Sequence, residues 1–189
     1  MLFLLIFGLV VGFSCVSTES LCPEKVAVEN FNISGIGRGI WYEVARYPYP
    51  YHKPIKFLTY ESRMEGDLYI AESINVDRTS PYFSEVFCMM APDARGRGKV
   101  TFSLNCPVRG RLIESPVLYI LGVDYDKYLV PYTCLHDADK KEIKEYGWIL
   151  SRTKPVIGKS KEEFIEICKK TGLDEDKLIW YDQEGSNDV

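Results

Sequence analysis

Two short stretches that lie far apart in the sequence constrain the fold more than any other feature. Residues 39–46 read GIWYEVAR, so a glycine and a tryptophan open a segment with strand character. Residues 148–152 read WILSR and end in an arginine shortly before a helical pattern begins. The guanidinium group of an arginine stacks well on the face of a tryptophan. We therefore expect Arg152 to pack on Trp41 and to close one end of a β-barrel.

Turn signals separate a series of short segments that alternate between apolar and polar residues. Such alternation is typical of a barrel wall with one packed face and one wet face. The expected strands cover residues 40–47, 56–63, 68–75, 82–90, 99–105, 117–122, 128–135 and 145–151. Eight antiparallel strands in up-and-down order can close around an interior that holds one small ligand. The sequence therefore predicts an all-β fold built on an eight-stranded barrel.

One C-terminal helix is expected to flank the barrel. Ser160 and Glu163 have the spacing of a capping box, and Gly172 stands where a residue just past a helix belongs. An apolar stripe between them consists of Phe164, Ile167 and Cys168. A helix with one apolar face needs an apolar surface to lie on, which the outer faces of the later strands can supply. Residues 178–181 then predict a short ninth strand.

The first residues of the chain have the pattern of a secretory signal. Residues 1–12 are almost wholly apolar, and small and polar residues follow them. This segment is too short for the alternative, a membrane anchor, since a spanning helix needs about 20 apolar residues. We expect a signal peptide over residues 1–20, cleaved near Ser17 or Ser20, and a single mature domain over residues 21–189. The expected product is secreted, and it is not an integral membrane protein.

Composition and motif content narrow the classes of function. The net charge is −4 and the basic residues are dispersed, so no nucleic-acid partner is expected. No catalytic constellation and no metal-site spacing is present in the sequence. Of the six cysteines, Cys15 falls in the signal, and the odd number that remains leaves at least one thiol unpaired within a monomer. In a secreted chain, Asn32-Ile33-Ser34 is a glycosylation sequon at Asn32.

Three motifs in order resemble those of the lipocalin family. Residues 30–44 contain the first, with its strand glycine and tryptophan, and Val123-Asp124-Tyr125 is similar to the second, usually Thr-Asp-Tyr. Arg152 after the last barrel strand matches the third. Within the family the resemblance is to the insect bilin-binding and apolipoprotein D-like branch. It implies four barrel-closing residues, which are Gly39, Trp41, Asp124 and Arg152.

The same resemblance implies a disulfide between Cys22 and Cys134, which tethers the N-terminal segment to a late strand. The second disulfide of that branch has no match, because residues 56–57 contain no cysteine and neither does the tail. The pairing of Cys88, Cys106 and Cys168 is therefore left open.

Strand phase predicts which side chains face the interior and contact a ligand. If Arg152 points inward, then Trp148 and Tyr146 share its face, and the family pattern places Thr133 and Leu135 inward on the preceding strand. The expected ligand-contacting residues are Glu72, Val86, Cys88, Phe102, Leu104, Leu118, Thr133, Leu135, Tyr146 and Trp148. The alternative interpretation of the apolar members is ordinary barrel core.

The resemblance implies an extracellular carrier of a small hydrophobic ligand, either a biliverdin-like bilin or another lipophile, with no required cofactor. One alternative is a lipocalin without a dedicated ligand, whose partner is a receptor, a membrane or a second copy of the chain. A remote alternative is a lipid isomerase that uses Cys88 as a cavity thiol, although burial in apolar surroundings makes a thiol inert.

Overall fold

The computed structural model describes residues 22–48, 58–73, 86–90, 96, 98–103, 117–137, 140, 142–154 and 157–181. Within these ranges, the side chains of Val86, Phe87, Met90 and Asp137 and of residues 101–103 and 157–160 lie outside the description as well.

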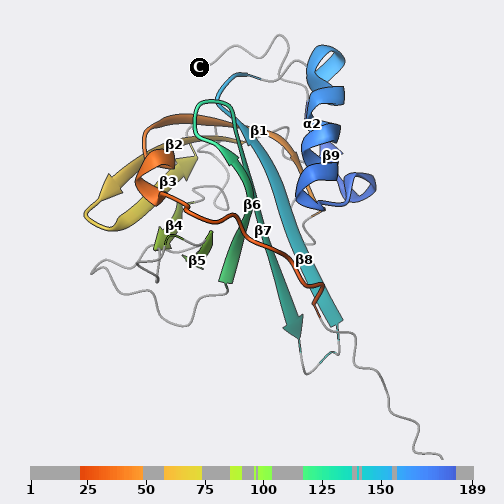
Figure 1. The fold of residues 1–189 in the computed structure, drawn as a ribbon, viewed down its shortest axis with the longest axis horizontal. Helices are drawn as coiled ribbons and strands as arrows, with labels where there is room; N and C mark the ends of the chain where they lie inside the picture. Colours follow the sequence, from red (N-terminus) through yellow and green to blue (C-terminus); the bar gives the residue numbers. More distant parts are fainter. Residues whose placement is uncertain are drawn as a thin grey trace, which may run out of the picture.

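Eight strands form the wall of a barrel (Figure 1). They are β1 (Gly39–Arg46), β2 (Thr59–Glu65), β3 (Leu68–Ser73), β4 (Val86–Met90), β5 (Lys99–Ser103), β6 (Val117–Asp124), β7 (Tyr128–Asp137) and β8 (Glu142–Ser151). Neighbours along the chain pair antiparallel from β2 to β8, and β1 closes the ring between β8 and the start of β2. The short β9 (Ile179–Trp180) pairs with the last two residues of β1. The predicted eight-stranded barrel with a ninth strand is confirmed.

The hairpin between β7 and β8 is longer than the sequence predicts. Pairing continues past Leu135 to Asp137 on β7 and starts at Glu142 on β8, where these two residues face each other. The added residues are mostly polar, so the pattern of a half-buried strand does not mark them. In Figure 1 this hairpin reaches well below the rest of the barrel. The parts of the predicted strands at residues 56–57, 74–75, 82–85 and 104–105 lie outside the described residues.

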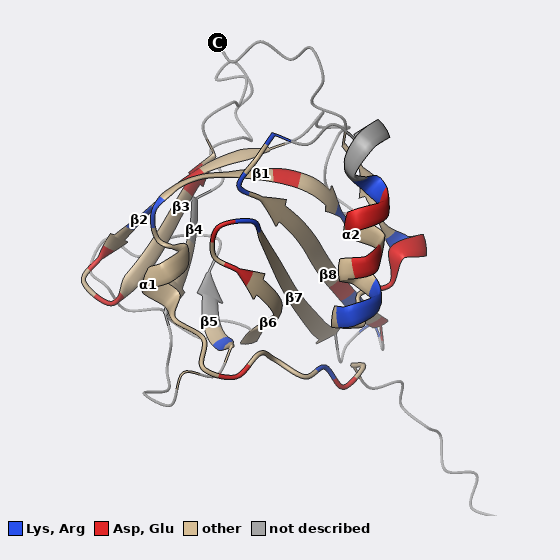
Figure 2. Cartoon of the chain, turned by 45° about the horizontal axis from the view of Figure 1, so that its top comes forward, with Lys and Arg blue, Asp and Glu red and all other residues tan. Residues whose placement is uncertain are grey.

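Helix α2 (Ile157–Thr171) lies along one side of the barrel, as Figure 2 shows with the top of Figure 1 turned forward. Its apolar stripe packs on outward-facing side chains of β1, β6, β7 and β8, including Val44, Leu121, Val130 and Ile149. The predicted capping box is wrong, because α2 begins at Ile157 and Ser160 already lies inside its first turn. At the other end Gly172 has a φ of 68°, which is the left-handed conformation expected past a helix C-terminus.

Cys168 faces the barrel from α2 and is the free cysteine among the described residues. It is almost fully buried, and burial raises the pKa of its thiol to about 11. The thiol therefore stays protonated near neutral pH and acts as a small apolar group in the packing.

One end of the barrel is closed by Arg152 and Trp41. The guanidinium carbon of Arg152 lies 3.6 Å from the centroid of the Trp41 ring, which is 0% exposed. Arg152 Nε donates to the Tyr125 carbonyl at 3.0 Å, and Nη1 donates to the carbonyls of Arg38 and Ile40. Arg152 thus connects the start of β1 to the turn between β6 and β7.

Two further residues shape this closed end. Asp124 Oδ1 accepts from the backbone N–H of Asp126 at 3.1 Å, which fixes the turn that presents Tyr125. Gly39 has a φ of 71°, and an added Cβ would lie 3.8 Å from Arg152 Nη1, so a side chain here would strain the backbone beside the arginine. The short helix α1 (Ile33–Ile36) covers the end, and its Ile36 carbonyl accepts from Trp41 Nε1 at 3.1 Å.

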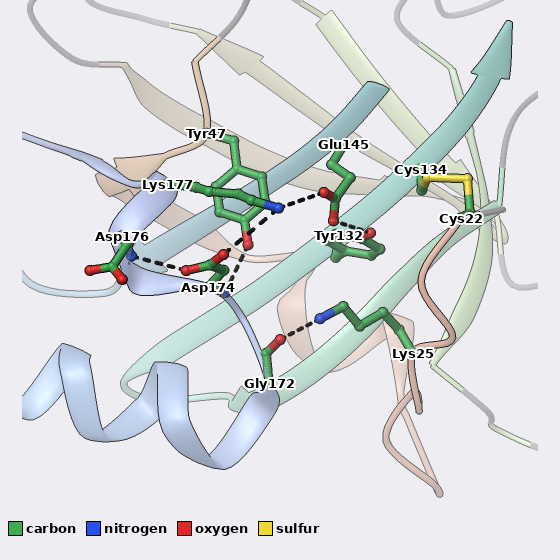
Figure 3. Close-up of polar contacts among 10 residues, drawn as sticks. All are labelled: Cys22, Lys25, Tyr47, Tyr132, Cys134, Glu145, Gly172, Asp174, Asp176 and Lys177. Carbon is green, nitrogen blue, oxygen red and sulfur yellow. Dashed lines mark hydrogen bonds and ion pairs between the residues drawn. A yellow bond between two sulfur atoms is a disulfide. The ribbon is translucent and has the colours of Figure 1, made fainter. Parts of the chain in front are cut away.

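A polar clasp fastens both ends of the described chain to the outer faces of β7 and β8 (Figure 3). The Cys22–Cys134 disulfide ties the N-terminal segment to β7, and Lys25 then donates to the Gly172 carbonyl after α2. Above this contact in Figure 3, the Tyr132 hydroxyl donates to Glu145 at 2.7 Å, and Lys177 of the 3-10 helix η1 (Glu175–Lys177) donates to the other oxygen of Glu145 at 2.7 Å.

The clasp also sets the protonation of Glu145. Burial acts to raise the pKa of this carboxyl group, but hydrogen bonds from Lys177 and Tyr132 outweigh it and hold the pKa below its ordinary value. The ionised form is therefore the one that the folded protein stabilises.

Trp41→Ala should destabilise the fold by about 3–5 kcal/mol, because it removes a large buried ring and the surface on which Arg152 stacks. Urea unfolding followed by near-UV circular dichroism measures this loss. Since Arg152→Ala acts on the same contact, the double variant should lose less than the sum of the two single losses. A Trp41→Ala protein with the stability of the parent would contradict the role of this pair in closing the barrel.

Glu145→Gln should make stability less sensitive to acid. A carboxyl group whose pKa is lowered on folding stabilises the fold above its unfolded pKa, and that stabilisation is lost as the pH falls through the folded pKa. The melting temperature of the parent should therefore fall more steeply than that of the variant from about pH 5 downward. Glu142→Gln, an exposed change on the same strand, is the control and should follow the parent.

Candidate ligand cavity

A small apolar cavity lies inside the barrel beyond the closed end. Its volume is about 50 Å³, and it is lined by Tyr60, Tyr69, Ala71, Met89, Leu118, Leu129, Pro131, Trp148 and Leu150. These residues come from β2, β3, β4, β6, β7 and β8, so the cavity lies on the barrel axis. None of the lining side chains carries a charge. The site can therefore hold an apolar body, with tyrosine hydroxyls as polar groups in its wall.

The cavity floor is joined to the closed end. Burial raises the pKa of Tyr69 well above its ordinary value, although its hydrogen bond with Ser62 acts in the opposite direction. Ser62 Oγ donates in turn toward the carbonyls of Ile36 and Gly39, at 3.1 and 3.0 Å. Tyr69 therefore stays neutral, and Ser62 links its surroundings to the carbonyls of the closed end.

Strand β8 turns the predicted face toward the interior. Trp148 and Leu150 both line the cavity, and Tyr146 stacks on Trp148 with ring centroids 6.3 Å apart and an angle of 16° between the planes. Because Trp148 is only partly buried and Tyr146 lies next to it on the side away from Arg152, the pair forms an aromatic wall on the side of the barrel away from the closed end.

Strands β6 and β7 supply the adjoining wall. Leu118 lines the cavity, as strand phase predicted. Thr133 lies opposite Tyr146 and is buried, and its hydroxyl donates to the Val117 carbonyl at 2.8 Å. Leu135 follows on the same face but is 38% exposed, beyond the cavity. The structure brings Leu118 and Trp148 together at the cavity, with Tyr146 and Thr133 next to them.

The predicted interior phase of β3 is wrong. Tyr69 and Ala71 line the cavity, so Glu72 is on the opposite face, where it is exposed and lies 3.5 Å from Arg63 of β2. An exposed cross-strand ion pair keeps both charges in water, whereas the predicted phase would desolvate the carboxylate. The charges of Glu72 and Arg63 are the feature of the sequence that could have indicated that both side chains face outward.

The predicted phase of β4 is wrong in the same way. Met89 lines the cavity, while Cys88 lies opposite Ile70 on the other face of the sheet. Cys88 is also disulfide-bonded, to a partner outside the described residues. The thiol that a cavity isomerase would need is therefore neither free nor directed into the cavity.

For three predicted contact residues the structure does not describe the side chain. The backbone of Phe102 pairs with that of Met89, and the backbone of Val86 pairs with that of Glu72, but neither side chain is among the described ones. Leu104 lies outside the described residues altogether.

Strand β1 contributes two charged residues to the inner face, which the sequence reasoning missed. Its register against β8 shifts between Glu43 and Ala45, so that Glu43 lies opposite Leu150 and Arg46 opposite Trp148. Such a bulge lets Val44 and Ala45 both pack outward under α2. Simple alternation from Trp41 places Glu43 inward but predicts the wrong face for Arg46.

The described residues offer no membrane-spanning helix of sufficient length and apolarity. Among them, no three histidine, cysteine, aspartate or glutamate side chains gather closely enough to bind a metal ion.

Comparison with known proteins agrees with this barrel fold. The family model described as "Lipocalin / cytosolic fatty-acid binding protein family" matches residues 38–184. The chain is 30% identical over 184 residues to the bilin-binding protein of Pieris brassicae, covering 96% of this chain and 95% of that protein. It is 30% identical over 180 residues to the outer membrane lipoprotein Blc of Escherichia coli K12, with 93% of each covered. The solved structure of insecticyanin from Manduca sexta superimposes with a TM-score of 0.64 at 26% identity, over 87% of both chains.

Proposed function

Because the chain belongs to the lipocalin family, we propose that it is an extracellular carrier that holds a small hydrophobic ligand inside its barrel. The observation that carries the proposal is the uncharged, partly aromatic cavity above the closed end. Its walls present aliphatic surface from Leu118, Leu129 and Leu150 and aromatic surface from Trp148. Apolar burial supplies the affinity, and stacking on the ring favours flat conjugated molecules.

A bilin-type pigment is the ligand that we place first. A relative at 30% identity is named a bilin-binding protein, and insecticyanin is a structural neighbour at 26% identity. Pockets for ligands of this size occupy about 300–1,000 Å³. Because the cavity measures about 50 Å³, loading has to displace side chains, and the partly buried Trp148 is placed to move. A slimmer lipophile would need less displacement.

We also propose that the protein is secreted. Residues 1–20 act as the signal peptide and residues 21–189 as the mature domain in this proposal. The Cys22–Cys134 disulfide supports it, since structural disulfides persist in oxidising compartments. Asn32 is the proposed glycosylation site. It is exposed next to α1 at the closed end, where a glycan would not obstruct the open end.

The proposed role is binding and transport rather than catalysis. No cofactor is required in this proposal, since the bilin or lipophile is the cargo. Partners other than the ligand, such as a receptor or a second copy of the chain, belong to the alternative in which the barrel has no dedicated ligand.

Protein purified from its native source should carry its ligand, visible as absorbance beyond that of the protein for a pigment or by mass spectrometry of an organic extract for a lipid. Ligand-free protein should then bind biliverdin, retinol or a fatty acid in titrations followed by absorbance and calorimetry. If the native protein carries nothing and the stripped protein binds none of the three, the carrier role fails and the interaction role takes its place.

Trp148→Ala should weaken ligand binding by about 1–3 kcal/mol, through lost apolar burial and lost stacking. Calorimetric titration measures the affinity without depending on tryptophan fluorescence. Trp180→Ala is the matched control, because Trp180 lies on the outer side of the barrel, near Lys161 of α2. Equal affinity of the parent and of Trp148→Ala would show that the aromatic wall does not contact the ligand.

A further inference from the structure

A buried ion pair lies on the inner face of β1, beside a cavity that has no charge of its own. Glu43 is 0% exposed and Arg46 is 7% exposed, and the β1 bulge places them opposite the cavity-lining residues Leu150 and Trp148. Tyr60, another lining residue, is close enough to Arg46 to act on its charge. The pair therefore stands at the side of the ligand site, level with its aromatic wall.

The contacts of Glu43 fix the carboxylate firmly. One oxygen, Oε2, accepts from the backbone N–H of Leu58 at 2.9 Å, and the Glu43 N–H donates to the Leu58 carbonyl at 2.9 Å. The other oxygen, Oε1, lies 3.5 Å from Arg46 Nε. Glu43 is thus held as a preorganised acceptor next to the guanidinium.

Arg46 is held less completely. Its guanidinium carbon lies 5.4 Å from the centroid of the Tyr181 ring. Burial acts to lower the pKa of Arg46, but the charge of Glu43 and the two tyrosines outweigh it, so the group stays charged. The Nε atom is buried and makes no hydrogen bond with any described residue. At 3.5 Å its ion-pair partner Glu43 Oε1 is too far away for a well-formed hydrogen bond, so an acceptor atom brought by a ligand would gain from meeting this N–H.

The charge balance of the pair determines which acceptor fits. Glu43 and Arg46 together are neutral, so a ligand carboxylate would bring an uncompensated negative charge next to Glu43 in a low-dielectric interior. A neutral group that carries an acceptor beside a donor avoids this penalty. Its acceptor can take the Arg46 N–H while its donor faces the Glu43 carboxylate.

We propose that Glu43 and Arg46 form a subsite for a neutral ligand group with adjacent acceptor and donor atoms, such as the hydroxyl of a lipid alcohol or the lactam of a bilin. This inference rests on the proposed carrier function and names the polar chemistry of the cargo.

The first experiment compares all-trans-retinol with all-trans-retinoic acid, which share the apolar body and differ in the polar end. The parent protein should bind retinol at least tenfold more tightly at neutral pH. Equal or tighter binding of retinoic acid would overturn the subsite, whereas failure to bind any probe would contradict the carrier function itself.

Two variants separate the subsite from simple desolvation of a carboxylate. Glu43→Gln leaves the Arg46 charge uncompensated, so the affinity for retinoic acid should rise at least tenfold relative to that for retinol. The double variant Glu43→Gln/Arg46→Met contains no buried charge and should lose the subsite. Its affinity for retinol should fall about tenfold, while that for retinoic acid changes little. A double variant that keeps the full preference of the parent would overturn the proposal.

Controls and a second ligand complete the test. Glu61→Gln removes an exposed carboxylate from β2 and should leave both affinities unchanged. Near-UV circular dichroism shows whether each variant keeps its fold. If Glu43→Gln does not fold, the double variant tests the proposal. A tenfold loss of biliverdin binding in the double variant would identify the lactam as a group that uses the subsite, and a loss confined to retinol would identify the hydroxyl. Loss of neither would contradict the inference.

Discussion

The stacking of Arg152 on Trp41 is the interaction on which the rest of the structure depends. One guanidinium, 3.6 Å from the ring centroid, also holds the carbonyls of Tyr125 and Ile40, so it joins the start of β1 to the β6–β7 turn. A barrel open at both ends would expose its interior to water from both sides. Above this closed end lies a cavity lined by uncharged side chains, where the burial of an apolar ligand would be favourable.

The inward-facing residues of a strand are predictable next to this anchor, but alternation alone does not identify them farther away. On β8, where Arg152 fixes the phase, Trp148 and Leu150 line the cavity as expected. On β3 no such residue indicates which side chains face inward. The predicted inward set, which includes Glu72, is shifted by one residue from the observed set. A slip of one residue inverts the whole strand. Turn signals and alternation are enough to predict the number of strands and their order. To predict which side chains face inward, one must also know which residues pair across neighbouring strands.

The bulge in β1 shows a second limit of sequence reasoning. Whether Arg46 faces in or out depends on a register shift against β8 and on β9, which pairs with β1 from the far end of the chain. Nothing in the local alternation of residues 39–46 encodes that shift. Glu43 and Arg46 lie three positions apart, so only Arg46 departs from simple alternation, and together they place two charges beside an otherwise uncharged interior. Strand periodicity alone therefore cannot assign the face of Arg46.

The described contacts on the outside of the barrel wall are unevenly distributed. Helix α2, the Cys22–Cys134 disulfide and the hydrogen bonds of Glu145 all brace β6, β7, β8 and β1 from outside. Among the described residues, no helix covers the outer faces of β2, β3 and β4. If a ligand larger than the cavity enters, the braced half can supply fixed contacts from Leu118 and Leu150, and the adjustment falls on the other half. We therefore expect Tyr69, Ala71 and Met89 to set how large a ligand the barrel accepts.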